Sequence, residues 1–113
     1  MAGLMDVFSI ASSGLQAASA KLNVTANNVV NADTPGYTAR RADTVELSTG
    51  GVAVESVQDT GQSVDLAQEM VDLSVEKHQY DANAMVVKTA DRMLGRLLDV
   101  MNGDDRNRDS SRH

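Results

Sequence analysis

The chain has 113 residues, the size of one small domain, and a formal net charge of −6, which disfavours nucleic acid and anionic lipid as partners. It has no cysteine, which excludes disulfide bonds and thiolate chemistry, and with 3% aromatic residues it must build its buried surface from Leu, Val, Ala and Met. No apolar run approaches the roughly 20 residues of a membrane span, and the N-terminus, which lacks a basic region and carries Asp6 among apolar residues, is not typical of a Sec signal peptide.

Residues 3–31 are predicted to form a helix with a narrow coiled-coil stripe. Its members follow one another at spacings of four and three, the a and d positions of a heptad, and large side chains mostly alternate with small ones. The stripe consists of Leu4, Phe8, Ala11, Leu15, Ala18, Leu22, Thr25 and Val29. Because tertiary packing supplies most helix stability, we expect this helix to need a partner. Gly14, inside the helix, indicates either a close helix contact or a local kink.

The stretch TANNVVNADTPGY, residues 25–37, is predicted to turn the helix into an extended chain. Asn is one of the few residues that tolerate the left-handed conformation, so the Asn side chains are expected to cap the last helical turn. Pro35 pushes Thr34 to extended geometry, and Gly36 suits the third position of a type II turn. The sequence thus predicts a corner after the helix, and the helix and the corner together form one unit, residues 1–37. The corner motif consists of Asn27, Asn28, Asn31, Asp33, Thr34, Pro35, Gly36 and Tyr37.

Residues 38–62 are predicted to form a β-hairpin or extended linker. Apolar residues alternate with polar ones on both sides of the turn sequence STGG: Val45 and Leu47 before it, and Val52, Val54 and Val57 after it. Gly50 and Gly51 are expected to supply the positive φ of a tight turn. Because two strands alone are marginal in water, we expect the hairpin to lie against a helix or a neighbouring subunit.

Residues 63–102 are predicted to form a second helix. Asp65 is its expected N-cap or first-turn residue, with Ser63 as a competing cap, and Asn102-Gly103 is its expected stop. Residues 103–113 are polar without periodicity and are predicted to be a disordered tail. The second stripe recurs at intervals of seven, with further apolar residues in intermediate layers, and consists of Leu66, Met70, Leu73, Tyr80, Ala84, Val87, Leu94, Leu98 and Met101.

Lys77 and Asp91 occupy two intermediate layers of the second stripe. One interpretation is that the helix rotates slightly, so that both charged side chains extend into water and Ala90 and Leu97 make the contact. The alternative is that the two charged residues fix helix register and partner number at some cost in stability. Gly95, like Gly14, indicates a close helix contact or a kink.

These elements predict a mainly α, elongated fold: two long terminal helices with coiled-coil stripes, joined by an Asn-rich corner and a small β-hairpin. At about 1.5 Å per residue the helices would span roughly 40 and 55 Å, too long for a compact domain of this size. The predicted molecule is a rod with apolar stripes along its length.

Enzymatic and metal chemistry are not indicated. The two histidines, His78 and His113, lack a neighbouring ligand set. Asp72 and Glu76 form a carboxylate pair at i and i+4, which usually lies on a solvated helix face. We therefore predict no catalytic residue, no metal and no cofactor.

Both ends of the chain resemble the signatures of bacterial flagellar rod and hook proteins. The segment SGLQAASAKLNVTANNVVNADTPGY is similar to the N-terminal signature, in which a Leu/Ala helix leads into Ala-Asn-Asn and then Thr-Pro-Gly-Tyr, although Val30 stands where that family usually has Ala. The segment VDLAQEMVDLSVEKHQYDANAMVVKTADRMLGRLLDVM resembles the C-terminal helix of the same family. The resemblance covers both ends, and two signatures in the right order make it specific.

The resemblance implies a structural protein that polymerises, with itself and with other rod and hook proteins, into the axial shaft of the flagellum. It implies export through the flagellar type III apparatus and a place in the periplasmic rod of the basal body, without a cleaved Sec signal. Most of these proteins carry larger outer domains in the middle, so a short proximal rod protein is the nearest type. In isolation we expect homo-oligomers. The alternative is a secreted helical-hairpin binding module or an export-linked adaptor.

Overall fold

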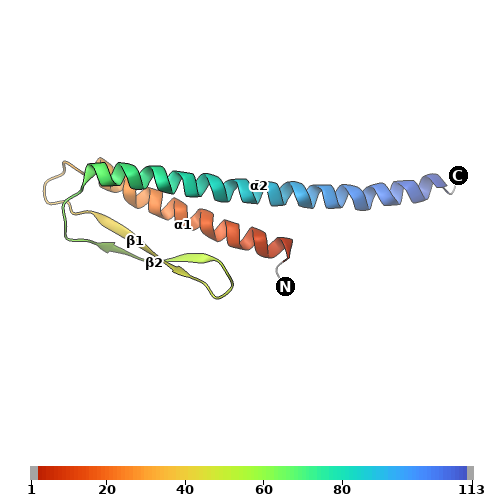
Figure 1. Ribbon diagram of the computed structural model, residues 1–113, viewed down its shortest axis with the longest axis horizontal. Helices are drawn as coiled ribbons and strands as arrows, with labels where there is room; N and C mark the ends of the chain where they lie inside the picture. Colours follow the sequence, from red (N-terminus) through yellow and green to blue (C-terminus); the bar gives the residue numbers. More distant parts are fainter. Residues whose placement is uncertain (1–2, 112–113) are drawn as a thin grey trace.

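The protein is an elongated pair of helices with a hairpin along one of them. A computed structural model describes residues 3–111, and the side chains of residues 3–103. The molecule measures 79 × 27 × 16 Å and most of its residues lie in two helices, which confirms the mainly α, elongated fold. Its elements, in chain order, are α1 (Leu4–Val30), β1 (Arg40–Glu46), β2 (Val52–Asp59) and α2 (Leu66–Ser111) (Figure 1).

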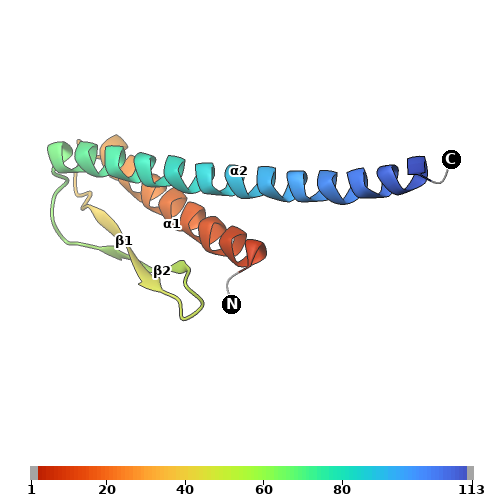
Figure 2. The ribbon, with the colours of Figure 1, turned by 45° about the vertical axis from the view of Figure 1, so that its right-hand side comes forward.

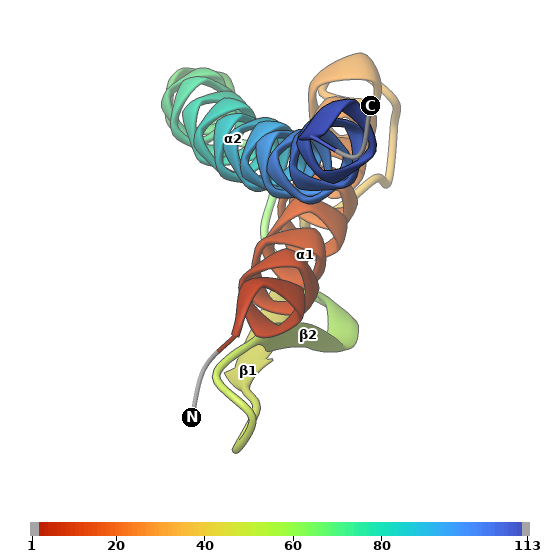
Figure 3. The same ribbon diagram turned by 90° about the vertical axis from the view of Figure 1, so that its right-hand side faces the viewer.

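Helix α1 lies in the middle of the molecule. It runs antiparallel to α2, as Figures 1 and 2 both show, and it contacts α2 as well as both strands of the hairpin. Figure 3, which looks along the long axis, shows α2 on one side of α1 and the hairpin on the other. Helix α2 is much the longer of the two, so its C-terminal part continues past the N-terminal end of α1 (Figure 1).

Two polar residues mark the beginnings of the helices. At α1 the Asp6 carboxylate accepts a hydrogen bond from the Gly3 N–H at 3.0 Å, and a negative charge in the first turn also suits the helix dipole. At α2 the side chain of Asp65 accepts the N–H of Gln68 at 3.2 Å. The predicted role of Asp65 as N-cap is therefore confirmed.

The C-terminal end of α2 differs from the prediction. The helix does not stop at Asn102-Gly103 but continues to Ser111, so the segment 103–111, expected to be a disordered tail, is helical. A glycine inside a helix costs only about 1 kcal/mol relative to alanine, and no proline follows to remove a helical N–H. The remaining residues of the predicted tail, 112–113, lie outside the described part of the chain.

The hairpin is an antiparallel pair whose register runs from Arg40 opposite Asp59 to Glu46 opposite Val52, with an irregularity between Asp43 and Thr44. In its turn the Gly50 N–H donates to the Leu47 carbonyl at 2.9 Å. Gly50 has φ of 96°, as expected for a tight turn, but Gly51 is not among the glycines with positive φ, so that expectation was wrong.

The hairpin is anchored on α1, as predicted for an otherwise marginal ribbon. Ser13 Oγ accepts the backbone N–H of Val52 at 3.1 Å and donates to the Ile10 carbonyl at 2.7 Å. Gly51 is buried there, and a Cβ on it would come within 2.6 Å of Ser13 Oγ. A glycine is thus needed at position 51 for a close approach and not for a left-handed conformation.

The core consists of small side chains. Among the described residues, the buried ones with apolar side chains are all alanines, namely Ala11, Ala17, Ala18, Ala39 and Ala90, while Thr25 and Asn28 are the buried polar ones. Larger apolar side chains are at most partly covered, and many are exposed. In the described part of the chain, neither helix has a stretch apolar and long enough to cross a membrane.

Candidate assembly interface

The first predicted stripe only partly coincides with the line along which α1 meets α2. The line of contact passes through residues that lie against α2 directly: Gly14 against Asn83, Thr25 against Glu76 and Asn28 against Glu69. Besides Thr25, which lies on this line, the small members Ala11 and Ala18 of the stripe are also buried. Its large members are only half-buried: Leu4, Phe8, Leu15, Leu22 and Val29. The large side chains thus lie to one side of the contact.

The second stripe also keeps much of its surface exposed. Four of its residues are half-buried, namely Leu73, Ala84, Val87 and Leu94. The other five are exposed: Leu66, Met70, Tyr80, Leu98 and Met101. Phe8 and Leu15 of α1 line an open apolar groove together with Val87 and Leu94, so part of both stripes is available on the same flank of the molecule. A continuous apolar flank of this kind is typical of an interaction surface.

The two charged residues in the second stripe are both exposed. Lys77 and Asp91 extend into water, and Ala90 makes the contact with a residual exposure of 3%. Leu97, which was expected to share that contact, is 54% exposed. A slight rotation of α2 therefore explains why Lys77 and Asp91 are exposed and Ala90 is buried, as the first interpretation predicted. The expected contact of Leu97 with α1 is not made.

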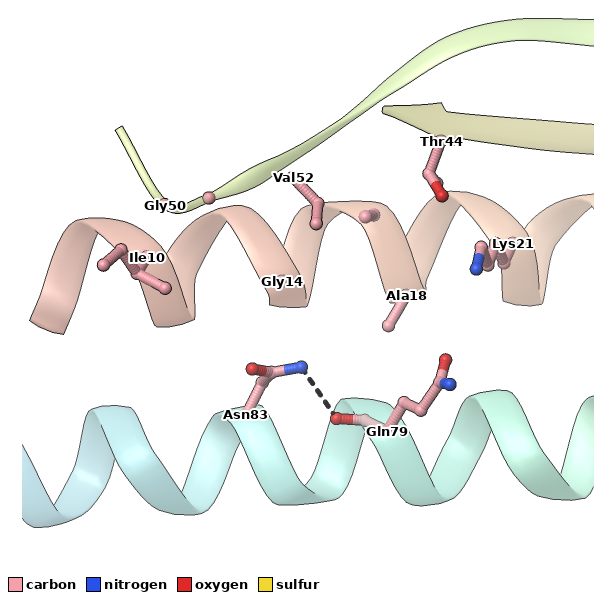
Figure 4. Close-up of a pocket in the computed structure, with 11 residues that line it drawn as sticks. Ile10, Gly14, Ala18, Lys21, Thr44, Gly50, Val52, Gln79 and Asn83 are labelled. Atoms are coloured by element: carbon pink, nitrogen blue, oxygen red, sulfur yellow. Dashed lines mark hydrogen bonds between the residues drawn. The ribbon is translucent and has the colours of Figure 1, made fainter. Parts of the chain in front are cut away.

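Gly14 marks a close approach of the two helices (Figure 4). A Cβ on Gly14 would come within 2.6 Å of Asn83 Oδ1, a distance that real Cβ atoms do not show. The Asn83 side chain projects from α2 toward α1 here, and its Nδ2 donates to the Gln79 carbonyl of its own helix at 3.0 Å. Of the two interpretations of Gly14, the close contact is therefore the one that the structure favours. Gly95 differs, since a Cβ there would meet open space.

The corner contains the predicted turn. The Tyr37 N–H donates to the Thr34 carbonyl at 3.1 Å, and Gly36 has φ of 78°, as a type II turn requires. Asn31 caps α1, because its Nδ2 donates to the Asn27 carbonyl at 2.9 Å. No Asn of the described chain has a positive φ, so the cap uses the amide side chain and not a left-handed backbone.

Asn28 has a different role from the predicted cap, because it joins three elements. Its side chain is 1% exposed. Nδ2 donates to the Arg40 carbonyl at 2.8 Å and to Glu69 Oε2 at 3.2 Å, and Oδ1 accepts the Tyr37 hydroxyl and the Arg40 N–H, both at 2.9 Å. An amide has two donor hydrogens and two main acceptor positions, and all four are used. Asn28 thus fixes the end of α1 to the start of β1 and to the first turn of α2.

A second polar contact lies one turn before Asn28. The hydroxyl of Thr25 lies 2.8 and 3.0 Å from the two carboxylate oxygens of Glu76 and donates to them. Burial raises the pKa of the Glu76 carboxyl above its ordinary value of 4.5, and the charges of Asp72 and Glu69 act in the same direction. The hydrogen bond from Thr25 and the charge of Lys21 oppose this rise in pKa. Glu76, expected on a solvated face, is therefore an interhelical residue.

The sequence patterns did not indicate that these residues of the two helices contact one another. Glu69 and Glu76 are separated by seven residues on α2, and their partners Asn28 and Thr25 by three on α1, so each pair lies on one face of its helix. This spacing is the signal that could have identified them. Within the described residues, no three His, Asp or Glu side chains come together in a way that could hold a metal ion.

Comparison with known families gives two matches, one at each end of the chain. A family model described as flagella basal body rod protein matches residues 8–38, which include most of α1 and the whole corner. A second, described as flagellar basal body rod FlgEFG protein C-terminal, matches residues 60–100 and thus most of α2. No curated protein sequence matches the chain. The two matches occur in the expected order and together cover well over half of the chain, which therefore belongs to the flagellar basal body rod protein family, a family of structural proteins.

Proposed function

We propose that this structural rod component is exported through the flagellar type III apparatus and assembles, with itself and with other rod and hook proteins, through its two terminal helices. The observation that carries the proposal is the apolar flank that remains after α1 and α2 have paired. It includes the groove lined by Phe8, Leu15, Val87 and Leu94. A slender molecule 79 Å long cannot cover this flank itself.

The composition of the core supports the same proposal. The buried apolar side chains of the described chain are alanines, which contribute little burial each, while Leu, Val and Met remain partly exposed. Full burial of one such larger side chain contributes about 1.5 to 3 kcal/mol. Burial by neighbouring molecules would therefore add the stabilisation that the isolated chain lacks, and ordering and assembly would be coupled.

In this proposal the corner motif positions the hairpin. Asn28 and the turn at Thr34–Tyr37 fix the direction in which β1 leaves α1, and Ser13 holds the far end of the hairpin. In a rod built from these helices, the hairpin would then project at the same angle from every copy. The assembly interface comprises the two stripes, and the corner motif has a positioning role.

Complementation of a strain that lacks the gene tests the proposal. We expect the deletion to give basal bodies without a complete rod and the wild-type gene to restore them in electron micrographs. Leu15→Glu, which places a charge in the apolar groove, should fail to restore the rod although the chain is still exported into the medium. Glu55→Gln, an exposed change on β2 outside the stripes, is the matched control and should complement. Complete rods in the deletion strain would refute the assignment.

The binding-module alternative predicts a different behaviour in solution. A helical-hairpin adaptor would form a stable one-to-one complex with another protein and would not associate with itself. Sedimentation and circular dichroism of the purified chain over a dilution series distinguish the two cases. A fully helical monomer at every concentration would contradict the coupling of ordering and assembly.

A further inference from the structure

The dipeptide Asn102-Gly103 lies in the part of α2 that α1 does not cover. Figures 1 and 2 show α2 continuing past the N-terminal end of α1 in this region, and Leu97, Leu98 and Met101 are 54, 52 and 59% exposed. Asn102 and Gly103 are exposed as well, and a Cβ on Gly103 would meet nothing within 4 Å. In the described part of the chain, only the backbone of α2 itself therefore holds the dipeptide in place.

An asparagine followed by a glycine can lose the ammonia of its side chain without an enzyme. The backbone nitrogen of the following residue attacks the side-chain carbonyl carbon, and a five-membered ring closes. Gly103 favours this attack for two reasons: it has no Cβ to shield its nitrogen, and its backbone adopts conformations that other residues avoid. Solvent also reaches the Asn102 side chain, so ammonia can leave and water can enter.

The helix slows this reaction but does not prevent it. In a helix the Gly103 N–H donates to the Asp99 carbonyl, and the ψ of Asn102 stays near the helical value, so the ring can close only where the helix has opened. Helical segments without tertiary contacts open locally far more often than the whole chain unfolds. The opening is made easier by two glycines in this stretch, Gly95 and Gly103, since glycine lowers helix propensity.

We propose that Asn102 is a site of spontaneous deamidation, at which the free chain slowly converts asparagine to aspartate and isoaspartate. In the first step the bond between the Gly103 nitrogen and Asn102 Cγ forms, the bond between Cγ and Nδ2 breaks, and the proton of the Gly103 nitrogen leaves with the ammonia. Water then opens the cyclic imide. Addition at Cγ gives aspartate, and addition at the main-chain carbonyl gives isoaspartate. The reaction consumes one water and releases one ammonia, and needs no other reactant.

The other asparagines with described side chains lack this combination of features. Each of them is followed by a residue that has a Cβ. Three of them also use their side-chain Nδ2 in a hydrogen bond to a backbone carbonyl, namely Asn28, Asn31 and Asn83. Asn23 and Asn27 are exposed, but they belong to α1, which packs against both α2 and the hairpin. Deamidation is therefore expected at Asn102 before any of these positions.

The isoaspartate product has a structural consequence. Its main chain runs through Cγ and is one carbon longer, so the helical hydrogen-bond pattern cannot continue across residue 102. We expect α2 to end close to Met101 in this product, and the new carboxylate makes the chain, which carries −6, more acidic. The proposal goes beyond the rod function, because it concerns how long a free chain keeps its full second helix.

Mass spectrometry of the purified full chain, incubated in mildly alkaline buffer with and without urea, tests the proposal. Trypsin releases residues 97–106, which contain the site, and deamidation adds about one dalton to this peptide. We expect conversion in the folded chain to be less than about a hundredfold slower than in urea, because local opening suffices. If global unfolding were required, the reaction would slow by about a thousandfold or more. A slowing of a hundredfold or more, or no conversion in urea, overturns the proposal.

Two variants test the chemistry and its dependence on the helix. Asn102→Gln keeps the amide but would need a six-membered ring, which closes much more slowly, so the added dalton should disappear. Gly95→Ala leaves the dipeptide unchanged and strengthens the same stretch of helix without a clash; it should slow the reaction about three- to fivefold in the folded chain and not in urea. Equal rates for wild type and Gly95→Ala in the folded chain would overturn the role of local opening. Neither result bears on rod complementation, so this inference can fail while the proposed function stands.

Discussion

The replacement of Asn28 by alanine should destabilise the fold more than any other single change at the corner. It removes four hydrogen bonds from a side chain that is 1% exposed, one of them to the carboxylate of Glu69. Each neutral bond contributes about 0.5 to 1.5 kcal/mol net, a bond to a charged group contributes more, and water that enters the cavity recovers a part. We therefore expect a loss of about 3 kcal/mol in the free energy of unfolding.

Urea unfolding followed by circular dichroism, at one fixed protein concentration, measures this loss. Asn27→Ala is the matched control, because Asn27 is the preceding residue, is exposed and lies outside the hydrogen-bond network of Asn28. Asn28→Asp separates hydrogen bonding from size: it keeps the acceptors for Tyr37 and Arg40, loses both donors and places a second carboxylate 3.2 Å from Glu69 Oε2. This repulsion should raise the pKa of the carboxylate pair in the folded state, so the Asp variant should be less unstable in acid than at neutral pH. Equal urea midpoints for Asn28→Ala and Asn27→Ala would refute the role of Asn28.

Three further predictions concern the helix contact and the hairpin. Gly14→Ala should lower the thermal stability although it raises helix propensity, because its Cβ collides with Asn83. Gly95→Ala should instead raise the stability of the monomer by up to about 1 kcal/mol, since its Cβ meets open space. Melting curves of both variants measure the two effects, and the reverse order of stabilities would contradict the prediction. Gly50→Ala should lower the free energy of unfolding by about 1 to 2 kcal/mol, because a φ of 96° is strained for any residue with a Cβ and Ile10 lies 3.3 Å from the new atom. Hydrogen exchange of the hairpin amides should accelerate in this variant, and unchanged exchange rates would contradict the expectation. Glu76→Gln should flatten the pH dependence of stability. The pKa of Glu76 in the folded state lies above 4.5, so the wild type has its full Glu76-dependent stability below pH 4.5 and loses it as the pH rises through the folded pKa. Urea unfolding over a pH series measures this, and a variant with the wild-type pH dependence would show that Glu76 does not cause it.

The elements with local signals could be predicted from the sequence. The turn at Thr34–Tyr37 depends on Pro35 and Gly36, and the start of α2 depends on Asp65, all within a few residues of the structure that they determine. The elongated, mainly α fold follows from two long periodic stretches with a short connection. The end of α2 could not be predicted in this way, because a glycine with no proline behind it only weakens a helix and does not end it.

The contacts between distant segments could not be predicted from local patterns. Asn28 was expected to cap its own helix, but its partners Arg40 and Glu69 come from other elements and are positioned by the tertiary fold. The coiled-coil pattern gives most weight to large residues such as Leu15, whereas α1 meets α2 along Gly14, Thr25 and Asn28. A polar residue at a helix contact has the same sequence pattern as a surface residue, so its role cannot be predicted before its partner is known. Of the residues that join the two helices, Gly14 and Thr25 were therefore indicated by the sequence, whereas the interhelical roles of Asn28, Glu69 and Glu76 were missed.

The unequal distribution of polar contacts along α1 has a mechanical consequence. The interhelical hydrogen bonds of Thr25 and Asn28 lie at the corner end, whereas the opposite half of the helix pair is in contact through alanine and through Gly14. Smooth surfaces of this kind lack the deep interdigitation that locks two helices together. The two helices can therefore change their separation at the end away from the corner with little loss of contact. In the proposed assembly, this freedom would let one sequence fit neighbours at slightly different spacings.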